Sequence, residues 1–349
     1  MTSRTIVSIN GDKFLIDGEA TYQGRMFERN KIEGLLLNAR LVQGVFDDRN
    51  PETRERFAYP DGPFDANRNT SEFLAMMPVW RNHGLVSFTI NLQGGSPEGY
   101  SQTHPWDNAA FSPEGEPDPA YLERLGRILD QADELSMAPI LGLFYFGQDD
   151  RLLDERAVLR AVMAVTDWLI ERGDRHVLME IANEVDVGHY THDIIKAHRC
   201  HELVELAQAS SRGKLDTPAG RLLVSTSMRG GTQPPDPILR VSDFILLHGN
   251  SVEDPNRIRK MIQDCRANPV YKGQPIVFNE DDHFDFDAED NNMLAAIGDY
   301  AGWGYFDYRM TGEGFDDGYQ SIPVNWAISS DRKQGFFDLL AKVTGSKPD

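Results

Sequence analysis

Two glutamates follow apolar stretches of the chain and could act together in catalysis. Glu184 comes just after the apolar run 176–182, Glu280 comes just after the run 275–279, and an asparagine precedes each glutamate. Two neighbouring carboxyl groups can hydrolyse a glycosidic bond, because one protonates the leaving oxygen while the other attacks the anomeric carbon or activates water. One glutamate alone is more often a surface or ion-paired residue, so the interpretation depends on the elements that carry the pair.

Eight short apolar runs divide the chain, and they are continuous rather than alternating, which is typical of buried parallel strands. The runs are 39–46, 85–92, 137–146, 176–182, 222–228, 242–248, 275–279 and 300–306. Segments with helical periodicity lie between them, namely 69–83, 119–136, 155–173, 192–212, 254–268 and 289–299. This alternation predicts an α/β fold, and eight units favour a closed (β/α)8 TIM barrel over an open sheet. Glu184 and Glu280 then end the fourth and seventh strands at one mouth of the barrel.

The remaining segments fit a single barrel domain over residues 1–349. Turn signals at Asn10-Gly11-Asp12 and Asp17-Gly18 predict a short N-terminal β-hairpin within residues 1–24, which we expect to close the bottom of the barrel. Three long segments follow strands one, two and eight, at 47–68, 93–118 and 307–330. In a barrel these loops lie on the carboxyl-terminal face, where active sites are found.

Composition excludes some partners. The 35 basic and 55 acidic residues give a net charge of −20, which opposes binding to nucleic acid and to anionic membranes. The N-terminus has no apolar leader and no apolar run approaches about 18 residues, so we expect a cytoplasmic protein without a membrane span. The two cysteines, Cys200 and Cys265, are interpreted as separate buried thiols.

The paired glutamates resemble those of clan A glycoside hydrolases, the group that includes cellulase-like family 5 and the β-galactosidases. Asn183-Glu184 matches the Asn-Glu acid/base motif at the end of strand four, and Glu280 matches the nucleophile that ends strand seven. The resemblance implies a retaining hydrolase of β-linked oligosaccharides or glycosides that works by double displacement and needs no cofactor. It also implies a hydrogen bond from Asn183 to the sugar 2-hydroxyl, and carboxyl groups about 5–5.5 Å apart.

The resemblance suggests roles for two further residues. His248 ends the sixth run, where the clan often has a residue touching the nucleophile, and Trp303 in the eighth run resembles the aromatic floor beneath the sugar. One departure is that the stretch 144–148, at the end of run three, lacks the histidine that family 5 enzymes often carry there.

Other polar and aromatic residues near the proposed mouth could contact sugar, although each could instead serve packing or loop structure. The candidates are Asn91, Gln93, Tyr145, Asn250 and Trp326. Arg40, in the first run, is expected to lie low in the barrel and to pair with Glu180 or another acid.

Two alternatives remain open. The first is a metal-dependent hydrolase on the same barrel, with ligands drawn from Asp47, Asp48, His248, Asp281, Asp282 and His283. The second is a barrel that binds carbohydrate without cleaving it. We expect no metal, because 285–289 lacks the glycine and the distal glutamate of a calcium loop and no Cys/His cluster has zinc spacing.

Overall fold

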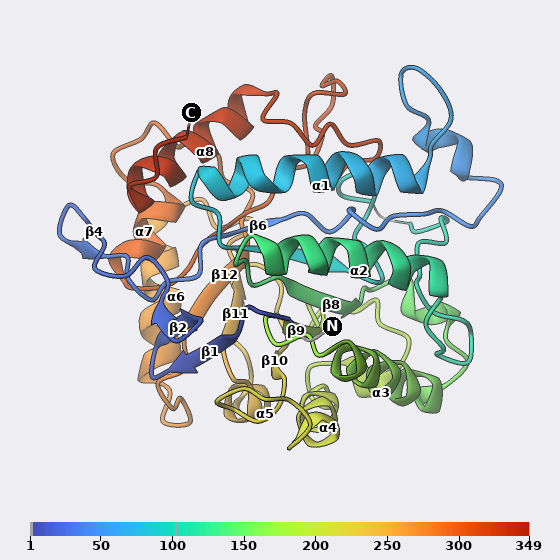
Figure 1. Cartoon of the computed structure of the whole chain (residues 1–349), viewed down its shortest axis with the longest axis horizontal. Helices are drawn as coiled ribbons and strands as arrows, with labels where there is room; N and C mark the ends of the chain where they lie inside the picture. The colour runs from blue at the N-terminus through green and yellow to red at the C-terminus, as the bar shows by residue number, and fades with distance from the viewer. Residues whose placement is uncertain (1–2, 102, 349) are drawn as a thin grey trace.

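The computed structural model describes residues 3–101 and 103–348, and it contains the predicted eight strands in chain order (Figure 1). The strands are β6 (Asn38–Arg40), β7 (Ser87–Asn91), β8 (Ile140–Phe144), β9 (Leu178–Ala182), β10 (Leu223–Ser225), β11 (Ile245–His248), β12 (Ile276–Glu280) and β13 (Gly304–Tyr305). Each strand overlaps one of the apolar runs. The expected α/β barrel is therefore confirmed, with Glu280 ending the seventh barrel strand and Glu184 two residues beyond the fourth.

The strands follow one another around a ring. Parallel pairing joins six of them in the order β10-β9-β8-β7-β6-β13, and β11 pairs with β12. Parallel bridges from Val277 to Gly302 and from Asp281 to Tyr305 join β12 to β13. The Asp243 N–H donates to the Val224 carbonyl at 3.0 Å, which links the start of β11 to β10. Every neighbouring pair is thus connected.

Helices surround this ring. They are α1 (Ala66–Asn82), α2 (Pro119–Glu134), α3 (Glu155–Arg172), α4 (His201–Ser211), α5 (Asp236–Val241), α6 (Pro255–Ala267), α7 (Asn292–Gly298) and α8 (Asp331–Thr344). Local signals set their ends: Asp118 caps α2 ahead of Pro119, and Gly173 ends α3 in a left-handed conformation with φ of 73°. The segment 192–212 is helical only from His201, because a separate 3-10 turn occupies Asp193–Ile195.

The N-terminal residues form an antiparallel sheet of β1 (Val7–Asn10), β2 (Lys13–Ile16) and β3 (Glu19–Ala20), followed by the small pair β4 (Met26–Phe27) and β5 (Asn30–Lys31). The Phe14 ring lies 5.9 Å from the Phe244 ring and belongs to a buried apolar cluster that includes Ile140, Leu178 and Val277 of the barrel strands. In Figure 1 this hairpin lies at the opposite end of the molecule from the loop around residue 50. Residues 1–2 of the predicted hairpin region lie outside the described residues.

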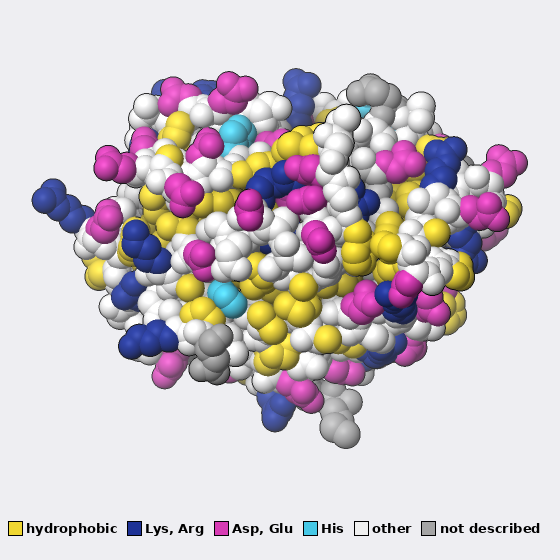
Figure 2. Space-filling model, turned by 90° about the horizontal axis from the view of Figure 1, so that it is seen from above, with side chains coloured by type: hydrophobic (Ala, Val, Ile, Leu, Met, Phe, Trp, Pro, Cys, Tyr) yellow, Lys and Arg dark blue, Asp and Glu magenta, His cyan; other side chains and the backbone are white. Residues whose placement is uncertain are grey.

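The surface carries charges of both signs. Acidic side chains are spread over the face seen in Figure 2, with lysine and arginine side chains between them. Among the residues that the structure describes, no helix combines the length and the apolar character needed to cross a bilayer. Cys200 and Cys265 are both free and buried, as predicted.

Candidate active site

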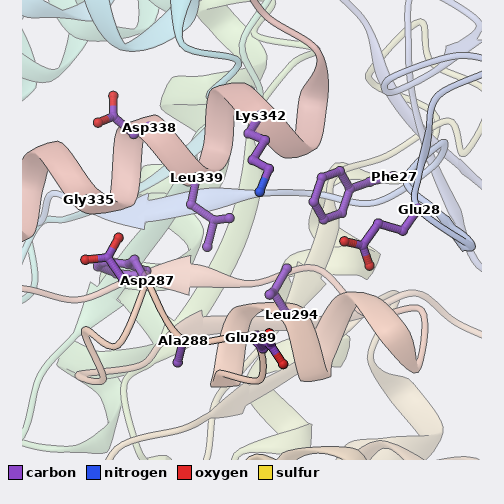
Figure 3. A pocket seen from close by; sticks show the side chains of 11 residues that line it. Phe27, Glu28, Asp287, Ala288, Glu289, Leu294, Gly335, Asp338, Leu339 and Lys342 are labelled. Carbon is purple, nitrogen blue, oxygen red and sulfur yellow. The ribbon is translucent and has the colours of Figure 1, made fainter.

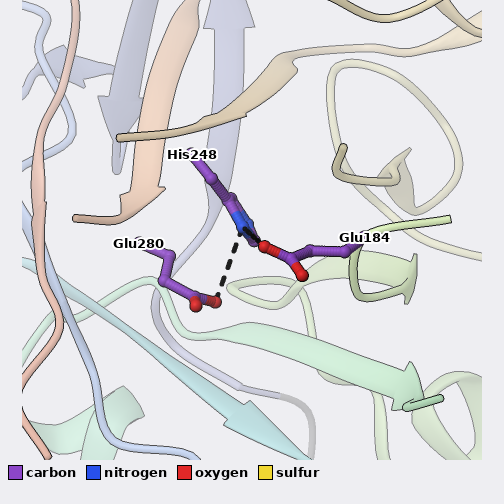
Figure 4. A group of neighbouring side chains, drawn as sticks. All are labelled: Glu184, His248 and Glu280. Carbon is purple, nitrogen blue, oxygen red and sulfur yellow. Dashed lines mark hydrogen bonds and ion pairs between the residues drawn. The ribbon is translucent and has the colours of Figure 1, made fainter. Parts of the chain in front are cut away.

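Glu184 and Glu280 lie together at the carboxyl-terminal mouth of the barrel, with His248 between them (Figure 4). One carboxylate oxygen of each glutamate and one ring nitrogen of His248 all lie within 4.8 Å of one another. Nδ1 of His248 is 2.9 Å from Oε1 of Glu184 and 3.6 Å from Oε2 of Glu280. The side chains of Glu184 and Glu280 are only 13% and 6% exposed, so the pair opens narrowly to solvent.

Two donors hold the Glu280 carboxylate. Nε of Arg40 lies 2.8 Å from Oε2, and Nδ2 of Asn250 donates to Oε1 at 2.5 Å. The arginine comes from β6 and the asparagine from just beyond β11, so residues from two other parts of the barrel hold the carboxylate. Arg40 pairs with an acid, as expected from the sequence, and that acid is Glu280 rather than Glu180. Together these contacts orient the Glu280 carboxylate.

His248 is fully buried between the two glutamates. Burial lowers the pKa of its imidazole, but the negative charges of Glu280 and Glu184 and the hydrogen bond to Glu184 outweigh burial, and the pKa is raised. A protonated ring donates from Nδ1 to Glu184 and attracts Glu280. The predicted contact between His248 and the nucleophile position is thus present as a 3.6 Å approach.

The backbone at Glu184 is strained in a way that aims its side chain. Its φ is 50°, a left-handed conformation that non-glycine residues seldom adopt. The Glu184 N–H donates to Oγ of Ser227 at 3.0 Å, and the Tyr190 hydroxyl donates to the Asn183 carbonyl at 2.5 Å. Hydrogen bonds on both sides therefore hold the strained residue in place. Oδ1 of Asn183 is buried and has no partner among the described residues, so it is free to meet a ligand.

A second polar layer lies beneath the glutamate pair. Glu180 is fully buried, and burial raises the pKa of its carboxyl while the charge of Arg40 opposes that rise. Asn279 donates to Glu180 at 3.3 Å. Asn91 lies level with Glu180, because the strand register pairs Asn91 with Gly142 and Gly142 with Glu180. Neither amide atom of Asn91 has a partner in the described part of the chain, so Asn91 faces the lumen one layer below Glu184.

Gln93 and Tyr145 are neighbours in the structure, and their side chains make different kinds of contact. Gln93 is buried, accepts from the Tyr145 N–H at 3.1 Å and donates to the Gln148 carbonyl at 3.2 Å, so its amide ties two loops together. The Tyr145 ring stacks on Phe146 with centroids 4.2 Å apart. Burial and the negative charge of Glu280 raise the pKa of the Tyr145 hydroxyl.

Two predicted sugar-contacting tryptophans lie elsewhere. The Trp303 ring packs 6.0 Å from Phe336 of α8, and its Nε1 donates to Asp281 at 2.8 Å. It therefore lies in the layer between the barrel and the helices, and it does not form a floor beneath the site. Trp326 packs 4.8 Å from Phe73 of α1 and donates to Asn69, so it also belongs to the outer core.

Phe306, which sequence reasoning missed, is a buried aromatic side chain that contacts Arg40. The Arg40 guanidinium lies 5.8 Å from the centre of its ring, on the same side as Glu280. Tyr100 and Tyr308 continue this row outward, with ring centroids 5.8 Å and 5.6 Å from that of Phe306. Phe306 ends the eighth apolar run and was therefore detectable, whereas nothing in the sequence placed Tyr100 here.

Of the six proposed metal ligands, Asp281, Asp282 and His283 lie together, with ligand atoms within 4.8 Å of one another, whereas Asp48 and His248 have other partners. Asp48 accepts from Thr53 at 2.5 Å and from the Asp107 N–H at 2.8 Å, which fixes a loop. Asp281 accepts from Trp303 and Asn292 and lies 2.6 Å from Nδ1 of His283. His248 belongs to the glutamate pair. The six residues therefore do not form the single metal site that the metal-dependent hydrolase alternative requires.

A cavity of about 620 Å³ lies on the outside of the barrel between β4, α7 and α8 (Figure 3). Apolar side chains such as Phe27 and Leu339 line it together with the charged groups of Glu289, Asp338 and Lys342. None of the residues that line this cavity belongs to the glutamate site.

Comparison with known proteins gives a fold and no closer relationship. No family model and no curated protein sequence matches the chain. The endo-1,4-β-mannanase from Rhizomucor miehei superposes with a TM-score of 0.60 at 13% identity, covering 98% of this chain and 100% of that one. A GH5-4 broad specificity endoglucanase from Bacteroides salanitronis superposes with a TM-score of 0.55 at 13% identity, covering 90% and 94%. A family 5 xyloglucan-specific endo-β-1,4-glucanase from a metagenomic library gives 0.52 at 14% identity, covering 90% and 97%. The chain is similar in fold to these family 5 glycoside hydrolases, so the clan A resemblance noted from the sequence is confirmed at the level of the fold.

Proposed function

We propose that this protein is a retaining glycoside hydrolase that cleaves β-linked glycosides, with Glu280 as nucleophile and Glu184 as acid/base. The observation that carries the proposal is the pair of carboxylates at one barrel mouth, within 4.8 Å of each other at their nearest ligand atoms and bridged by His248. The similar structures are named endoglucanases and an endo-1,4-β-mannanase, which supports a β-linked carbohydrate as the substrate class.

The separation of the carboxylates supports retention of configuration. Retaining enzymes place the two groups about 5–5.5 Å apart, whereas inverting enzymes need about 6.5–9.5 Å to admit a water molecule between carboxylate and sugar. One oxygen of each carboxylate lies within 4.8 Å of the other, an upper bound on their nearest approach that is compatible with the shorter distance. Direct attack by Glu280 on the anomeric carbon is thus the simpler chemistry.

In the first step, an oxygen of Glu280 bonds to the anomeric carbon while Glu184 gives its proton to the departing glycosidic oxygen. The products are a covalent glycosyl-enzyme and a free alcohol. In the second step, Glu184 takes a proton from water, the water oxygen bonds to the anomeric carbon, and Glu280 leaves as a carboxylate. Arg40 and Asn250 orient Glu280 for both steps and balance its negative charge.

His248 and Asn183 support this cycle from the two sides. The imidazole lies close to both glutamates and, when protonated, stabilises whichever carboxylate is ionised at a given step. The buried, unpartnered amide oxygen of Asn183 is available to the sugar 2-hydroxyl, an interaction that strengthens in the transition state. Tyr145 and Asn91 complete the polar surroundings without a defined step of their own.

The test is to trap the covalent intermediate. Incubation with 2-deoxy-2-fluoro β-glycosides of glucose, mannose, galactose and xylose should label one peptide, the one that contains Glu280. Glu280→Gln should prevent labelling, and both Glu280→Gln and Glu184→Gln should lower kcat by at least about 10³-fold.

Glu289→Gln is the matched control, because Glu289 is exposed and lines the outer cavity. It should behave as the wild type. Full hydrolytic rate in both glutamine variants would refute the assignment, and tight glycan binding without turnover by the wild type would favour a carbohydrate-binding barrel.

A further inference from the structure

The loop after β7 crosses the barrel mouth and is fastened along its course. Residues 94–97 and Gly99 are buried although they belong to no helix or strand. The Gly95 carbonyl accepts from Nε2 of Gln43 at 3.0 Å, beyond the end of β6. The Pro97 carbonyl accepts from the Ile322 N–H at 2.8 Å, in the loop that follows β13. The segment 95–100 therefore passes over the ends of β6 and β13.

The far end of this segment is fixed next to the nucleophile. The Tyr100 hydroxyl donates at 3.0 Å to Oδ2 of Asp282, two residues beyond Glu280. The Tyr100 ring meets the Tyr308 ring edge-on at 4.7 Å. A Cβ added at Gly99 would lie 3.1 Å from the Tyr308 ring, so the backbone here is already in close contact with its neighbour. The segment thus spans from β7 to β12 and stands as a wall beside Glu280.

The position of this wall relative to the two glutamates determines which part of a substrate it meets. The leaving group takes its proton from Glu184 and must depart on the β9 side of the mouth. The sugar that becomes bonded to Glu280 would extend away from Glu184, toward the side of Glu280 that Tyr100 borders through its contacts with Asp282 and Phe306. A glycan that continued beyond that sugar would then meet the segment 95–100.

From this arrangement, and on the basis of the proposed function, we propose that segment 95–100, with Tyr100 at its tip, ends the binding site one sugar beyond the scissile bond. The enzyme would then act as an exo-glycosidase that removes single sugars from the non-reducing end of a β-linked chain. Tyr100 would be a specificity-determining residue. The similar structures are named as endo-acting enzymes, so this feature would set the present chain apart from them.

The experiment uses 4-nitrophenyl β-glycosides of glucose, mannose, galactose and xylose together with the matching 4-nitrophenyl β-1,4-disaccharides. For the accepted sugar, the wild type should release nitrophenol directly from the monosaccharide glycoside. From the disaccharide glycoside it should release nitrophenol only after a lag, with an initial kcat/KM lower by at least about 100-fold. The first sugar product from a reduced pentasaccharide should be the monosaccharide.

Tyr100→Ala should open the wall and reduce this preference by about tenfold, because one large side chain is removed while the rest of the segment stays fastened. Leu153→Ala is the matched control: Leu153 is 69% exposed in another mouth loop, and its removal should leave the preference unchanged. A melting curve for each variant would show whether it is folded. If Tyr100→Ala does not fold, the wild-type product pattern still decides the matter.

The outcomes separate the two proposals. Early release of disaccharides or trisaccharides by the wild type, abolished in Glu280→Gln, would overturn exo action and leave the glycosidase assignment intact. An unchanged preference in folded Tyr100→Ala would remove Tyr100 from the wall. The absence of Glu280-dependent hydrolysis of every substrate would reject the proposed function, and the exo inference with it.

Discussion

The two ends of the barrel lumen are built by the same strands and have opposite chemistry. The lower end holds apolar side chains such as Ile140, Leu178 and Val277, covered by Phe14 of the hairpin. The upper end holds Arg40, Glu180 and the glutamate pair, several of them with polar atoms that lack a partner among the described residues. Buried polar groups of this kind cost free energy that the apolar end must offset. Stability is therefore concentrated at one end of the strands, and chemistry at the other.

Left-handed backbone occurs at both ends. Glu184, at the upper end, has φ of 50°, and Ser251 beside the site has φ of 59°. At the lower end, Asp17 of the hairpin has φ of 54° and Ser136, ahead of β8, has φ of 50°. Backbone strain therefore does not distinguish the two ends, whereas the polarity of their side chains does.

The largest expected effect comes from removing the buried cation at the upper end. Arg40→Met should lower kcat/KM by about 10³-fold, because Glu280 loses the ion pair that orients its carboxylate. It should also destabilise the fold by about 3–5 kcal/mol, since a buried carboxylate is left without its partner. Kinetics on the accepted 4-nitrophenyl glycoside and urea unfolding measure the two effects.

Arg229→Met is the control for that change, because Arg229 pairs with Asp186 at 3.2 Å while its side chain is 63% exposed. Exposed pairs contribute little, so both measurements should remain near wild type. An Arg40→Met enzyme with wild-type kcat/KM would show that the upper layer does not orient the nucleophile.

A comparable loss of stability, without loss of catalysis, is expected at the lower end. Phe14→Ala should lower the free energy of unfolding by about 3–5 kcal/mol, because a fully buried ring leaves a cavity in the apolar cluster. Below the melting temperature its kcat should match that of the wild type. Phe14→Leu, the control, should lose much less stability. A large fall in kcat for folded Phe14→Ala would contradict the idea that the lower end contributes stability and the upper end catalysis.

The smallest effect concerns pH. The pKa of His248 is raised in the folded state above its ordinary value of about 6.5, so its contribution to stability is fully present below that pH. The contribution is lost as pH rises through the folded-state pKa. The difference in Tm between wild type and His248→Gln should therefore become less favourable to the wild type as pH increases above about 6.5. A pH-independent difference would mean that His248 keeps one protonation state throughout.

The strands, most of the helices and the positions of the two glutamates could be predicted, because they depend on the pattern of neighbouring residues. A buried strand appears in the sequence as a continuous apolar run, and an amphipathic helix appears as a periodic pattern with capping residues at its ends. Both signals involve only neighbouring residues. The order of the runs then placed Glu184 and Glu280 at one mouth, because parallel strands in a closed barrel all end on the same face. Helices α5 and α8 were not predicted: α5 has only six residues and shows little periodicity, and α8 follows the last apolar run, whereas the predicted helices all lie between runs.

The face on which each side chain lies was harder to predict. Successive residues of a strand point to opposite sides, so an error of one position moves a residue from lumen to outer core. Trp303 and Tyr305 point outward toward α8, where the Tyr305 ring stacks on Phe336 at 4.5 Å. Phe306 lies on the other side, beside Arg40. The run 300–306 is apolar on both faces, and its pattern could not distinguish them.

The sequence by itself determined the succession of strands and helices and the two glutamates, because short-range periodicity and chain order encode them. Only the tertiary structure decided that Arg40 pairs with Glu280, that His248 lies between the carboxylates and that Tyr100 reaches Asp282. These contacts join residues 32 to 240 positions apart. Such pairs depend on strand register and loop path, which are set by the packing of the whole barrel and leave no trace in local sequence.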